Sequence, residues 1–404
     1  MIVENNNYPG DPRVRREAEA LAAYGYHVCV ISPAKDGQRL REEMCGIKVY
    51  RYPAAPHAHG AAGYLVEYGY SMCAIFCITL LVLLRDGFDV IHAANPPDTL
   101  VFIGLLYKLL GKRFVYDHHD LAPELYYARF SGRGSALIYS LLLWCERQSC
   151  RFADQVITTN ESHRSIENLR DGIDRQRITI VRNGPDLSRI RIGDTDPMLC
   201  RRGRGILVYA GVIGVQDGVD LLVRSLHHLI HHLGKTSFFC VIIGDGEAMP
   251  MVKELIRELF LQDHVWCAGW IDDTIRYMRY LASADICVDP SPSNAYNDRC
   301  TTIKLMEYMA VQKAIVTFDL PENRFTAQSA GLYARPNDEA DFARCIARLL
   351  EDPLTRHTMG AFGRRRVETE LSWAHSVPEL LKVYQRILPN QLASTERVRS
   401  RSVI

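Results

Sequence analysis

Short apolar runs alternate with helical patterns along the first half of the chain. Runs with the length and composition of strands lie at residues 1–4, 27–32, 47–52, 90–93, 113–116, 155–158 and 178–181. Between the first two runs, apolar side chains recur at helical spacing. There, Asp11 suits the N-cap, Pro12 suits the first helical position and Gly25 suits the end of the helix. Alternation of this kind predicts a parallel sheet with helices on both faces.

The same alternation begins again after a polar, arginine-rich stretch at residues 186–205. Strand-like runs then read "GILVYAG", "FFCVIIGDG", "HVWCAGW", "ADICVDPS" and "KAIVTFD", with helical segments between them and mostly helix from 339 to 388. We therefore predict two doubly wound, Rossmann-like α/β domains joined by one linker. Such pairs bind ligands in the cleft between the carboxyl ends of their two sheets.

The charge balance and the cysteines indicate which kinds of partner and which cellular compartment to expect. The 404 residues carry 48 basic and 47 acidic side chains, so no overall field favours nucleic acid. Local basic clusters ("RRGRG", "GRRRVE" and "RVRSRS") are either solvated surface or contacts with an acidic membrane surface. The twelve cysteines form no CxxC pair, which indicates small buried side chains in a reducing compartment. The start of the chain lacks a signal-peptide pattern, so we expect a cytoplasmic protein.

One apolar run leaves contact with a membrane open. Residues 68–84, "YGYSMCAIFCITLLVLL", hold 17 residues without a charge, which is the short limit for a spanning helix. The run fits a helix on the core or surface of the protein, a helix that touches a bilayer, or a span. In the second case the protein would be peripheral on the inner face of the cell membrane, where four arginines are candidates for facing it: Arg129, Arg133, Arg147 and Arg151.

Three strand ends in the second half are candidates for binding a ligand. Gly211 and Gly214 follow the first strand, where free backbone N–H groups and a helix start form a phosphate cradle, although glycines also serve ordinary turns. The next strand ends in Gly244, and Asp245 is placed to accept a ligand hydroxyl or to cap a helix. The third strand ends in a segment suited either to hold a nucleobase or to pack a domain edge: Gly269, Trp270 and Ile271.

Two histidines and a carboxylate follow a strand in the first half. The segment "YDHHDLAPE" places His118, His119 and Asp120 at the sheet edge that should face the cleft. Histidine titrates near neutrality, so these side chains are candidates for proton or oxygen chemistry, while the alternative is a structural role in a strand-end loop. We expect no metal, because this segment has no partner cluster of ligands. Asp285 and Asp289 read as strand ends rather than as a metal pair.

The order and spacing of these motifs resemble the retaining glycosyltransferases of family four, which have the GT-B fold. The resemblance runs from "YPGDPRVRREAEALAAYGYHV" through "YDHHDLAPE", "VRNGPD", "YAGVIG", "VIIGDGE" and "CAGWI" to "KLMEYMAVQKAIVTFDLPE". The chain is most similar to bacterial enzymes that extend lipid-linked oligosaccharides for exopolysaccharide, capsule or O-antigen. This resemblance implies retaining transfer of a sugar from a nucleotide-sugar, with UDP-sugars favoured. Together with the apolar run at 68–84, it makes a polyprenyl-diphosphate-linked glycan the candidate acceptor, and we expect no cofactor and no metal requirement.

The functional residues of the family map onto this chain one by one. Glu307 matches a glutamate that binds the donor ribose, and His119 with Asp120 matches the histidine loop near the donor sugar. Gly211 and Gly214 match the diphosphate loop, and the segment 269–271 matches the one that holds the base. The resemblance also assigns a loop that approaches the diphosphate and the acceptor, with Pro9, Gly10, Asp11 and Arg13.

The chain departs from the family at three positions. Arg299 stands eight residues before Glu307, where the family usually has its first glutamate, and Val212 and Asp217 replace a usual arginine and lysine. We therefore expect the stretch "NDRCTTIKLMEYMA" to supply the missing charge near the donor diphosphate, through Arg299 and Lys304 at the start of a helix and with Thr302 beside them. The alternative is that Arg299 is a surface residue paired with Asp298 or Glu322.

The resemblance also suggests where the domains begin and end. We expect an acceptor-side domain at 1–186, a linker at 187–204, a nucleotide-sugar-binding domain at 205–371, a helix at 372–390 that returns to the first domain, and a basic, disordered tail at 391–404. Two other functions use the same fold: a nucleotide-sugar 2-epimerase, and a non-catalytic partner that binds a nucleotide-sugar.

Overall fold

The computed structural model describes residues 1–55, 60–130, 132–190, 195–201 and 205–389. The expected tail, and residues 191–194 and 202–204 of the expected linker, lie outside this part of the chain. Contacts divide the chain into two units. The N-terminal unit comprises Met1–Pro123, Ser135–Arg182 and the chain from Ser376 onward, and the C-terminal unit comprises Glu124–Gly134 and Asn183–His375.

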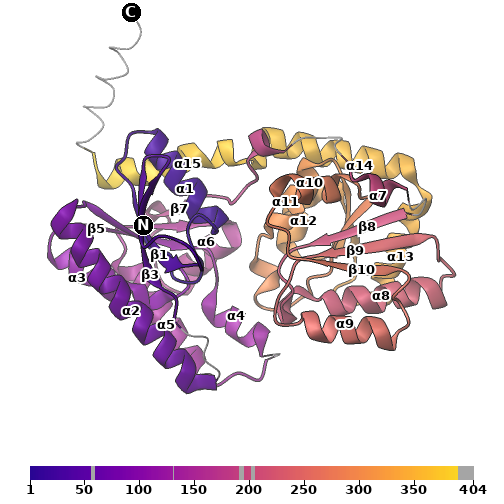
Figure 1. Ribbon diagram of the computed structural model, residues 1–404, viewed down its shortest axis with the longest axis horizontal. Coiled ribbons are helices and arrows are strands. Elements are labelled where there is room, and N and C mark those ends of the chain that lie inside the picture. The colour runs from indigo at the N-terminus through magenta and orange to yellow at the C-terminus, as the bar shows by residue number, and fades with distance from the viewer. Residues whose placement is uncertain (56–59, 131, 191–194, 202–204, 390–404) are drawn as a thin grey trace, which may run out of the picture. The chain divides into compact units, whose positions relative to one another are not determined.

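A mostly parallel sheet forms the centre of the N-terminal unit (Figure 1). Its strands are β1 (Cys29–Ala34), β2 (Arg41–Met44), β3 (Ile47–Pro53), β4 (Val90–Ala94), β5 (Arg113–His118), β6 (Gln155–Thr158) and β7 (Ile178–Ile180). They pair in the orders β2-β3-β1 and β4-β5-β6-β7, and Ile2 joins the two groups by bridging Ile31 and Ala93. β2 is antiparallel to β3 and was missed in the sequence, because its polar side chains lie outside the core.

Helices between these strands cover the sheet, and the first of them shows how local sequence sets their ends. The helices are α1 (Pro12–Ala23), α2 (Gly60–Arg85), α3 (Val101–Leu109), α5 (Ala136–Phe152) and α6 (Glu161–Leu169). A further helix, α4 (Ala122–Arg129), belongs from Glu124 onward to the C-terminal unit. In α1, Asp11 Oδ1 accepts the N–H of Val14 at 2.8 Å, and Gly25 ends the helix with a φ of +89°. Both ends agree with the sequence prediction.

The long helix α2 packs through one narrow stripe. Ser71, Ile75, Thr79 and Val82 are buried, and their spacing places them on one side of the helix. Met72, Ile78 and Leu83 are half-buried against the same core. The most exposed apolar side chains of the helix are Val66, Phe76, Leu80, Leu81 and Leu84. Among the described residues, α2 contains the one segment, Val66–Arg85, that is long and apolar enough to cross a membrane.

A parallel six-stranded sheet in the order β10-β9-β8-β11-β12-β13 forms the centre of the C-terminal unit (Figure 1). Its strands are β8 (Gly205–Ala210), β9 (Phe238–Ile243), β10 (Val265–Gly269), β11 (Ile286–Asp289), β12 (Ala314–Phe318) and β13 (Gly331–Ala334). The helices are α7 (Pro197–Cys200), α8 (Val219–His231), α9 (Met249–Glu258), α10 (Thr274–Ala282), α11 (Ile303–Ala310), α12 (Pro321–Ala327), α13 (Glu339–Glu351) and α14 (Pro353–Arg366).

Alternating strand residues of this sheet face two separate cores. Leu207 and Tyr209 of β8 pack with α8, α9 and α13, while Val208 packs on the opposite face with α10 and α11. The sheet is therefore buried on both sides, as a doubly wound fold requires.

The last helix, α15 (Trp373–Ile387), joins the N-terminal unit from Ser376 onward. Ser376 Oγ donates to the Arg182 carbonyl at 2.7 Å, and the Tyr384 hydroxyl lies 2.9 Å from His92 Nδ1. The C-terminal helix thus returns to the first unit, as the fold prediction stated.

Candidate functional site

Three strand-end loops of the C-terminal unit meet through their backbones. A Cβ added to Gly244 would lie 1.8 Å from the Gly211 carbonyl oxygen, so the loops after β8 and β9 approach too closely for a side chain there. Gly244 N–H donates to the Gly269 carbonyl at 2.9 Å, which ties the loop after β10 to the same place. The predicted donor glycines therefore gather at the carboxyl edge of this sheet, where doubly wound folds bind ligands.

Lys304, in the first turn of α11, points at the Gly211 loop. A Cβ added to Gly211 would lie 3.2 Å from Lys304 Cε. The ammonium is 3.3 Å from Asp217 Oδ1, 3.5 Å from Asp289 Oδ1 and 3.3 Å from the Tyr209 hydroxyl. Burial favours the neutral amine, but the Tyr209 oxygen and the two carboxylates outweigh it and hold the pKa of Lys304 well above its usual range. The cation is therefore present beside the loop, with two carboxylates balancing it.

Glu307 follows Lys304 by three residues and lies on the same side of α11. Its Oε2 accepts a 2.7 Å hydrogen bond from the hydroxyl of Tyr277 on α10. Burial and then the charge of Glu307 raise the pKa of Tyr277 well above its usual range, so Tyr277 remains a donor that fixes this carboxylate. The sequence did not single out Tyr277, because an aromatic residue within an amphipathic helix usually belongs to the core.

The nucleobase candidate Trp270 lies at the surface. Its side chain is 61% exposed, and its Nε1–H donates to Asp272 at 2.9 Å. Ile271 packs partly against the core formed by α10 and α11. The indole face therefore remains open to solvent beside Gly269.

The stretch before α11 is held against the glycine loops by Asn297. Its Nδ2 donates to the Gln216 carbonyl at 2.9 Å, and Gln216 belongs to the turn that follows Gly214. Two residues later, Arg299 donates from Nη1 to the Ala295 carbonyl at 2.6 Å. Thr302 Oγ1 lies 3.5 Å from Asp289 Oδ2. The structure thus brings Lys304, Thr302 and the Gly211 loop together, while Arg299 is tied to its own turn.

In the N-terminal unit, Asn95 holds the predicted histidine loop in shape. This buried residue follows β4, and its Oδ1 accepts the N–H groups of His119 at 2.9 Å and Asp120 at 3.1 Å. Its Nδ2 donates to the Asp120 carbonyl at 2.6 Å. Asn95 was not predicted, although a polar residue directly after the buried run "VIHAA" is a recognisable signal.

The two predicted histidines have different environments. His119 Nδ1 lies 3.5 Å from Asp117 Oδ2, and its side chain retains 15% exposure. Burial lowers the pKa of His119, but the Asp117 carboxylate outweighs burial and raises it overall. His118 is fully buried, with Nδ1 at 2.8 Å from Glu167 and Nε2 at 3.5 Å from Glu146. We therefore correct the sequence assignment for His118: its ring belongs to a buried ion cluster.

Arg13 also differs from the expectation, because it is buried. Its Nε and Nη2 form a bidentate pair with Asp117 at 2.8 and 2.5 Å, and its Nη1 donates to the Val181 carbonyl. Of the same loop, Asp11 caps α1, and a Cβ on Gly10 would lie 2.7 Å from the Asn7 side chain. Arg13 therefore supports Asp117 beneath His119. The role of Pro9 and Gly10 in approaching the acceptor stays a prediction.

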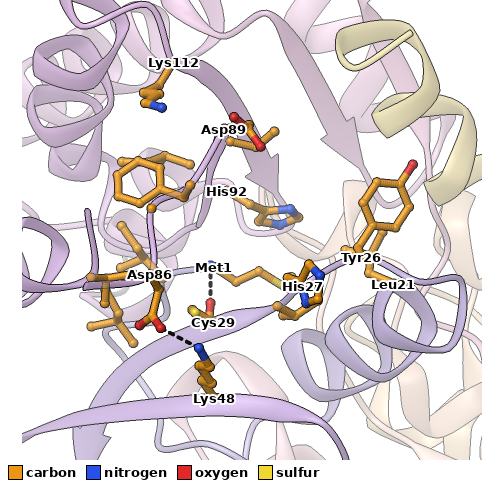
Figure 2. Close-up of a pocket in the computed structure, with 18 of the residues that line it drawn as sticks. Met1, Leu21, Tyr26, His27, Cys29, Lys48, Asp86, Asp89, His92 and Lys112 are labelled. Carbon is orange, nitrogen blue, oxygen red and sulfur yellow. Dashed lines mark hydrogen bonds and ion pairs between the residues drawn. The ribbon is translucent and has the colours of Figure 1, made fainter. Parts of the chain in front are cut away.

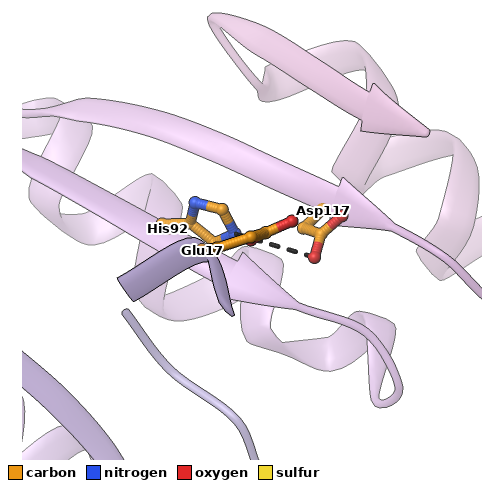
Figure 3. Close-up of side chains that lie close together, drawn as sticks. All are labelled: Glu17, His92 and Asp117. Atoms are coloured by element: carbon orange, nitrogen blue, oxygen red, sulfur yellow. Dashed lines mark ion pairs between the residues drawn. The ribbon is translucent and has the colours of Figure 1, made fainter. Parts of the chain in front are cut away.

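Glu17, His92 and Asp117 converge in the same buried cluster (Figure 3). Their ligand-type atoms lie within 4.8 Å of one another, which has the spacing of a metal site. However, Arg13 already neutralises Asp117 and lies 3.3 Å from Glu17. Burial lowers the pKa of His92, but the neighbouring Asp117 and Glu17 carboxylates outweigh it and raise the pKa overall. The two carboxylates therefore already have partners within the protein. The cluster fits an internal ion network better than a metal centre.

A cavity of about 650 Å³ lies at the opposite edge of the N-terminal sheet (Figure 2). It is lined by residues at the beginnings of strands, including Cys29, Lys48 and Val90, and by Tyr384 of α15. The predicted loops lie at the carboxyl ends of strands, so this cavity is separate from them.

Two doubly wound units, glycine loops at a carboxyl edge and a returning C-terminal helix define the GT-B class of α/β enzymes. Residues 10–184 match the glycosyl transferase 4-like domain, and residues 204–352 match the glycosyl transferases group 1. These two matches span most of the chain. The chain therefore belongs to the family-four glycosyltransferases, which are retaining enzymes that use nucleotide-sugar donors.

Curated relatives agree with this family. The chain is 26% identical over 301 residues to alpha-maltose-1-phosphate synthase from Mycolicibacterium smegmatis, covering 69% of this chain and 74% of that protein. It is 26% identical over 257 residues to D-inositol 3-phosphate glycosyltransferase from Nocardia farcinica, covering 60% and 55%. These relatives support the family rather than the narrower capsule and O-antigen group.

Solved structures show the same fold. Sucrose-phosphate synthase from Thermosynechococcus elongatus aligns with a TM-score of 0.76 at 19% identity, covering 93% of each chain. HepE from Anabaena, in complex with UDP-glucose, aligns with a TM-score of 0.72 at 15% identity, covering 95% of this chain and 99% of that one. At these identities the likeness establishes the GT-B fold alone.

Proposed function

We propose that this glycosyltransferase moves a sugar from a UDP-sugar to a growing, lipid-linked oligosaccharide in cell-surface polysaccharide synthesis. The observation that carries the donor half is the position of Lys304 and Glu307 on one face of α11, beside the Gly211 loop. A nucleoside diphosphate presents charge and a ribose diol at a fixed spacing, and one helix face offers an ammonium and a carboxylate to match them.

In this proposal the C-terminal unit holds the donor. The diphosphate binds Lys304 and the backbone N–H groups of the loop at Gly211 and Gly214, while the ribose hydroxyls donate to Glu307. Trp270 and the adjoining segment bind the base. Gly244 lets the loop at Gly211 lie close to its own loop. Thr302 adds to the diphosphate side, as the sequence analysis expected, and Arg299 would add to it once its side chain leaves the Ala295 carbonyl.

His119 is the residue that we assign to the transferred sugar. Asp117 lies beside Nδ1 of His119. The Nε2 side of the ring is therefore directed away from Asp117, and we assign it to a sugar hydroxyl. Asp120 stands beside it in a loop that Asn95 fixes. Retention proceeds on one face of the sugar: the departing phosphate takes the proton of the acceptor hydroxyl as the new glycosidic bond forms. The protein supplies position and electrostatic stabilisation.

The acceptor half of the proposal is supported by an apolar surface on the N-terminal unit. The Tyr107 hydroxyl of α3 donates to Thr79 of α2, and Phe102 of α3 lies with its ring 6.1 Å from Trp144 of α5. These three neighbouring helices expose large apolar side chains: Val66, Leu80, Leu84, Leu109, Leu137 and Leu141. Exposed apolar side chains on neighbouring helices suit the boundary of an acidic bilayer that carries a polyprenyl-linked acceptor.

Titration calorimetry with UDP, GDP, ADP and dTDP tests the donor assignment. UDP should bind most tightly, and Glu307→Ala should weaken it by at least tenfold because the ribose loses its acceptor. Glu254→Ala, on the exposed face of α9, is the matched control. Equal weak binding of all four nucleotides would contradict the UDP assignment.

Liposome flotation tests the membrane half separately. Wild-type protein should float with vesicles that contain anionic lipid. Leu80→Lys should not, because a charge on the exposed side of α2 opposes insertion into the bilayer. Equal flotation of both proteins, or none, would reject membrane contact by α2 and leave the donor assignment intact.

A further inference from the structure

Four histidines lie at the end of α8 in the sequence "LHHLIHH", and the donor site uses none of them. His227 and His231 are four residues apart, as are His228 and His232, so each pair shares one helical face. The ring centroids are 4.3 Å apart in the first pair and 4.5 Å apart in the second. His231 and His232 are exposed, and the other two are half-buried, so both pairs are accessible from solvent.

Paired imidazoles on adjacent helical turns have the geometry of a chelate. An ion with metal–nitrogen bonds of about 2.0–2.1 Å requires its two nitrogens to be about 3.0–3.4 Å apart. Centroids 4.3 and 4.5 Å apart place the rings of each pair close enough for side-chain rotation to bring one nitrogen of each ring to this separation. Burial and then the neighbouring His232 lower the pKa of His228, so its ring is neutral at pH 7, which is the form that binds metal.

The pair of His228 and His232 is the better chelate of the two. The ring planes are inclined by 19° in this pair and by 40° in the pair of His227 and His231, so both pairs need side-chain rotation to turn two nitrogens toward one ion. The charge around His228 is what distinguishes the two pairs. The carboxylates of Asp338 and Glu339 act on His228, against one nearby cation on Arg344. The first pair has only other histidines acting on His227. The negative end of the helix dipole adds a further attraction for a cation at this place.

We infer that His228 and His232 bind one divalent transition-metal ion of the class that imidazole favours, such as Ni²⁺, Cu²⁺ or Zn²⁺. The ion would link His228, in the last turn of α8, to His232, the C-cap residue of that helix. It is a surface site, distinct from the donor loops, because His228 lies ten residues after Gly218 along α8, a rise of about 15 Å. Sugar transfer does not require it.

Calorimetric titration of NiCl₂ into full-length protein without a polyhistidine tag tests the inference. Nickel is the probe because exposed cysteines such as Cys73 and Cys77 would compete for zinc. Wild-type protein should bind one ion per chain. His228→Ala/His232→Ala should weaken binding by at least tenfold, while His227→Ala/His231→Ala should retain it. Thermal melts of each variant check that the fold is intact.

The result is independent of the donor proposal, because UDP affinity should be the same in wild-type protein and both double variants. Absence of saturable nickel binding by the wild type would overturn the inference. So would equal losses in the two double variants, because that result would show no preference for His228 and His232. Copper-loaded protein gives a second readout: its electron paramagnetic resonance spectrum should show two coordinated nitrogens in the wild type and lose them in His228→Ala/His232→Ala.

Discussion

Asp217 stands where the resembled family usually has a lysine, so it reverses the charge next to the donor loop. Its Oδ1 lies 3.3 Å from Lys304, and its Oδ2 accepts the Gly214 N–H at 3.1 Å. Asp217→Asn removes the charge and keeps an oxygen for Gly214. We predict that this change tightens UDP binding, because Lys304 then has one fewer carboxylate competing with the diphosphate.

The structure sets the size of this effect. A phosphate bound to Lys304 would lie about 6 Å from Asp217, which is two hydrogen-bond lengths. At an effective dielectric constant of about 20 to 40, the repulsion between two unit charges at that distance is about 1.4 to 2.8 kcal/mol. Removing it should lower the Kd for UDP by about 10- to 100-fold.

Calorimetry at low and high salt measures the gain. Because the interaction is between charges in a partly exposed loop, the gain should shrink as salt rises. Asp263→Asn, which removes an exposed charge from the same unit, is the control for net charge and should leave the Kd unchanged. An unchanged or higher Kd in Asp217→Asn would refute the placement of the diphosphate beside Lys304.

The other predictions concern positioning and stability. Tyr277→Phe should weaken UDP binding by about fivefold in calorimetry, since the Glu307 carboxylate loses one hydrogen bond worth about 1 kcal/mol; unchanged affinity would exclude a role for Tyr277. Tyr384→Phe should lower the urea midpoint by the equivalent of about 1 kcal/mol, because His92 loses its partner on α15, and an unchanged midpoint would contradict that. Burial lowers the pKa of His118, but its glutamate partners outweigh burial and raise it well above 6.5. Its stabilisation should therefore be complete below pH 6.5 and be lost as the pH rises through the folded pKa, and urea melts of His118→Gln should show a flatter pH profile than the wild type.

Sequence patterns were sufficient to locate most of the strands and to place glycine loops at the ends of strands. Apolar runs located most of the parallel strands, because those strands are largely buried, and Asp11 and Gly25 marked the ends of α1 through local capping. The parallel strand β13 was not predicted, because it is short and only partly buried. The glycines at 211 and 244 were recognised because they end strands, and their contact confirms that they gather at one edge. β2 was missed because its polar, exposed side chains carry no such pattern.

Only the tertiary structure decided which charged side chains can reach a ligand and which are paired inside the protein. Neighbours in sequence, His118 and His119, point to opposite environments, because successive residues at the end of a strand face opposite sides of the sheet. Arg13 is neutralised by Asp117, which is 104 residues away in the chain, and Lys304 by Asp217 and Asp289. Sequence by itself determined the fold and the residue types at its loops, since these depend on local patterns. The charge state and exposure of each candidate depended on partners that only the folded chain brings together.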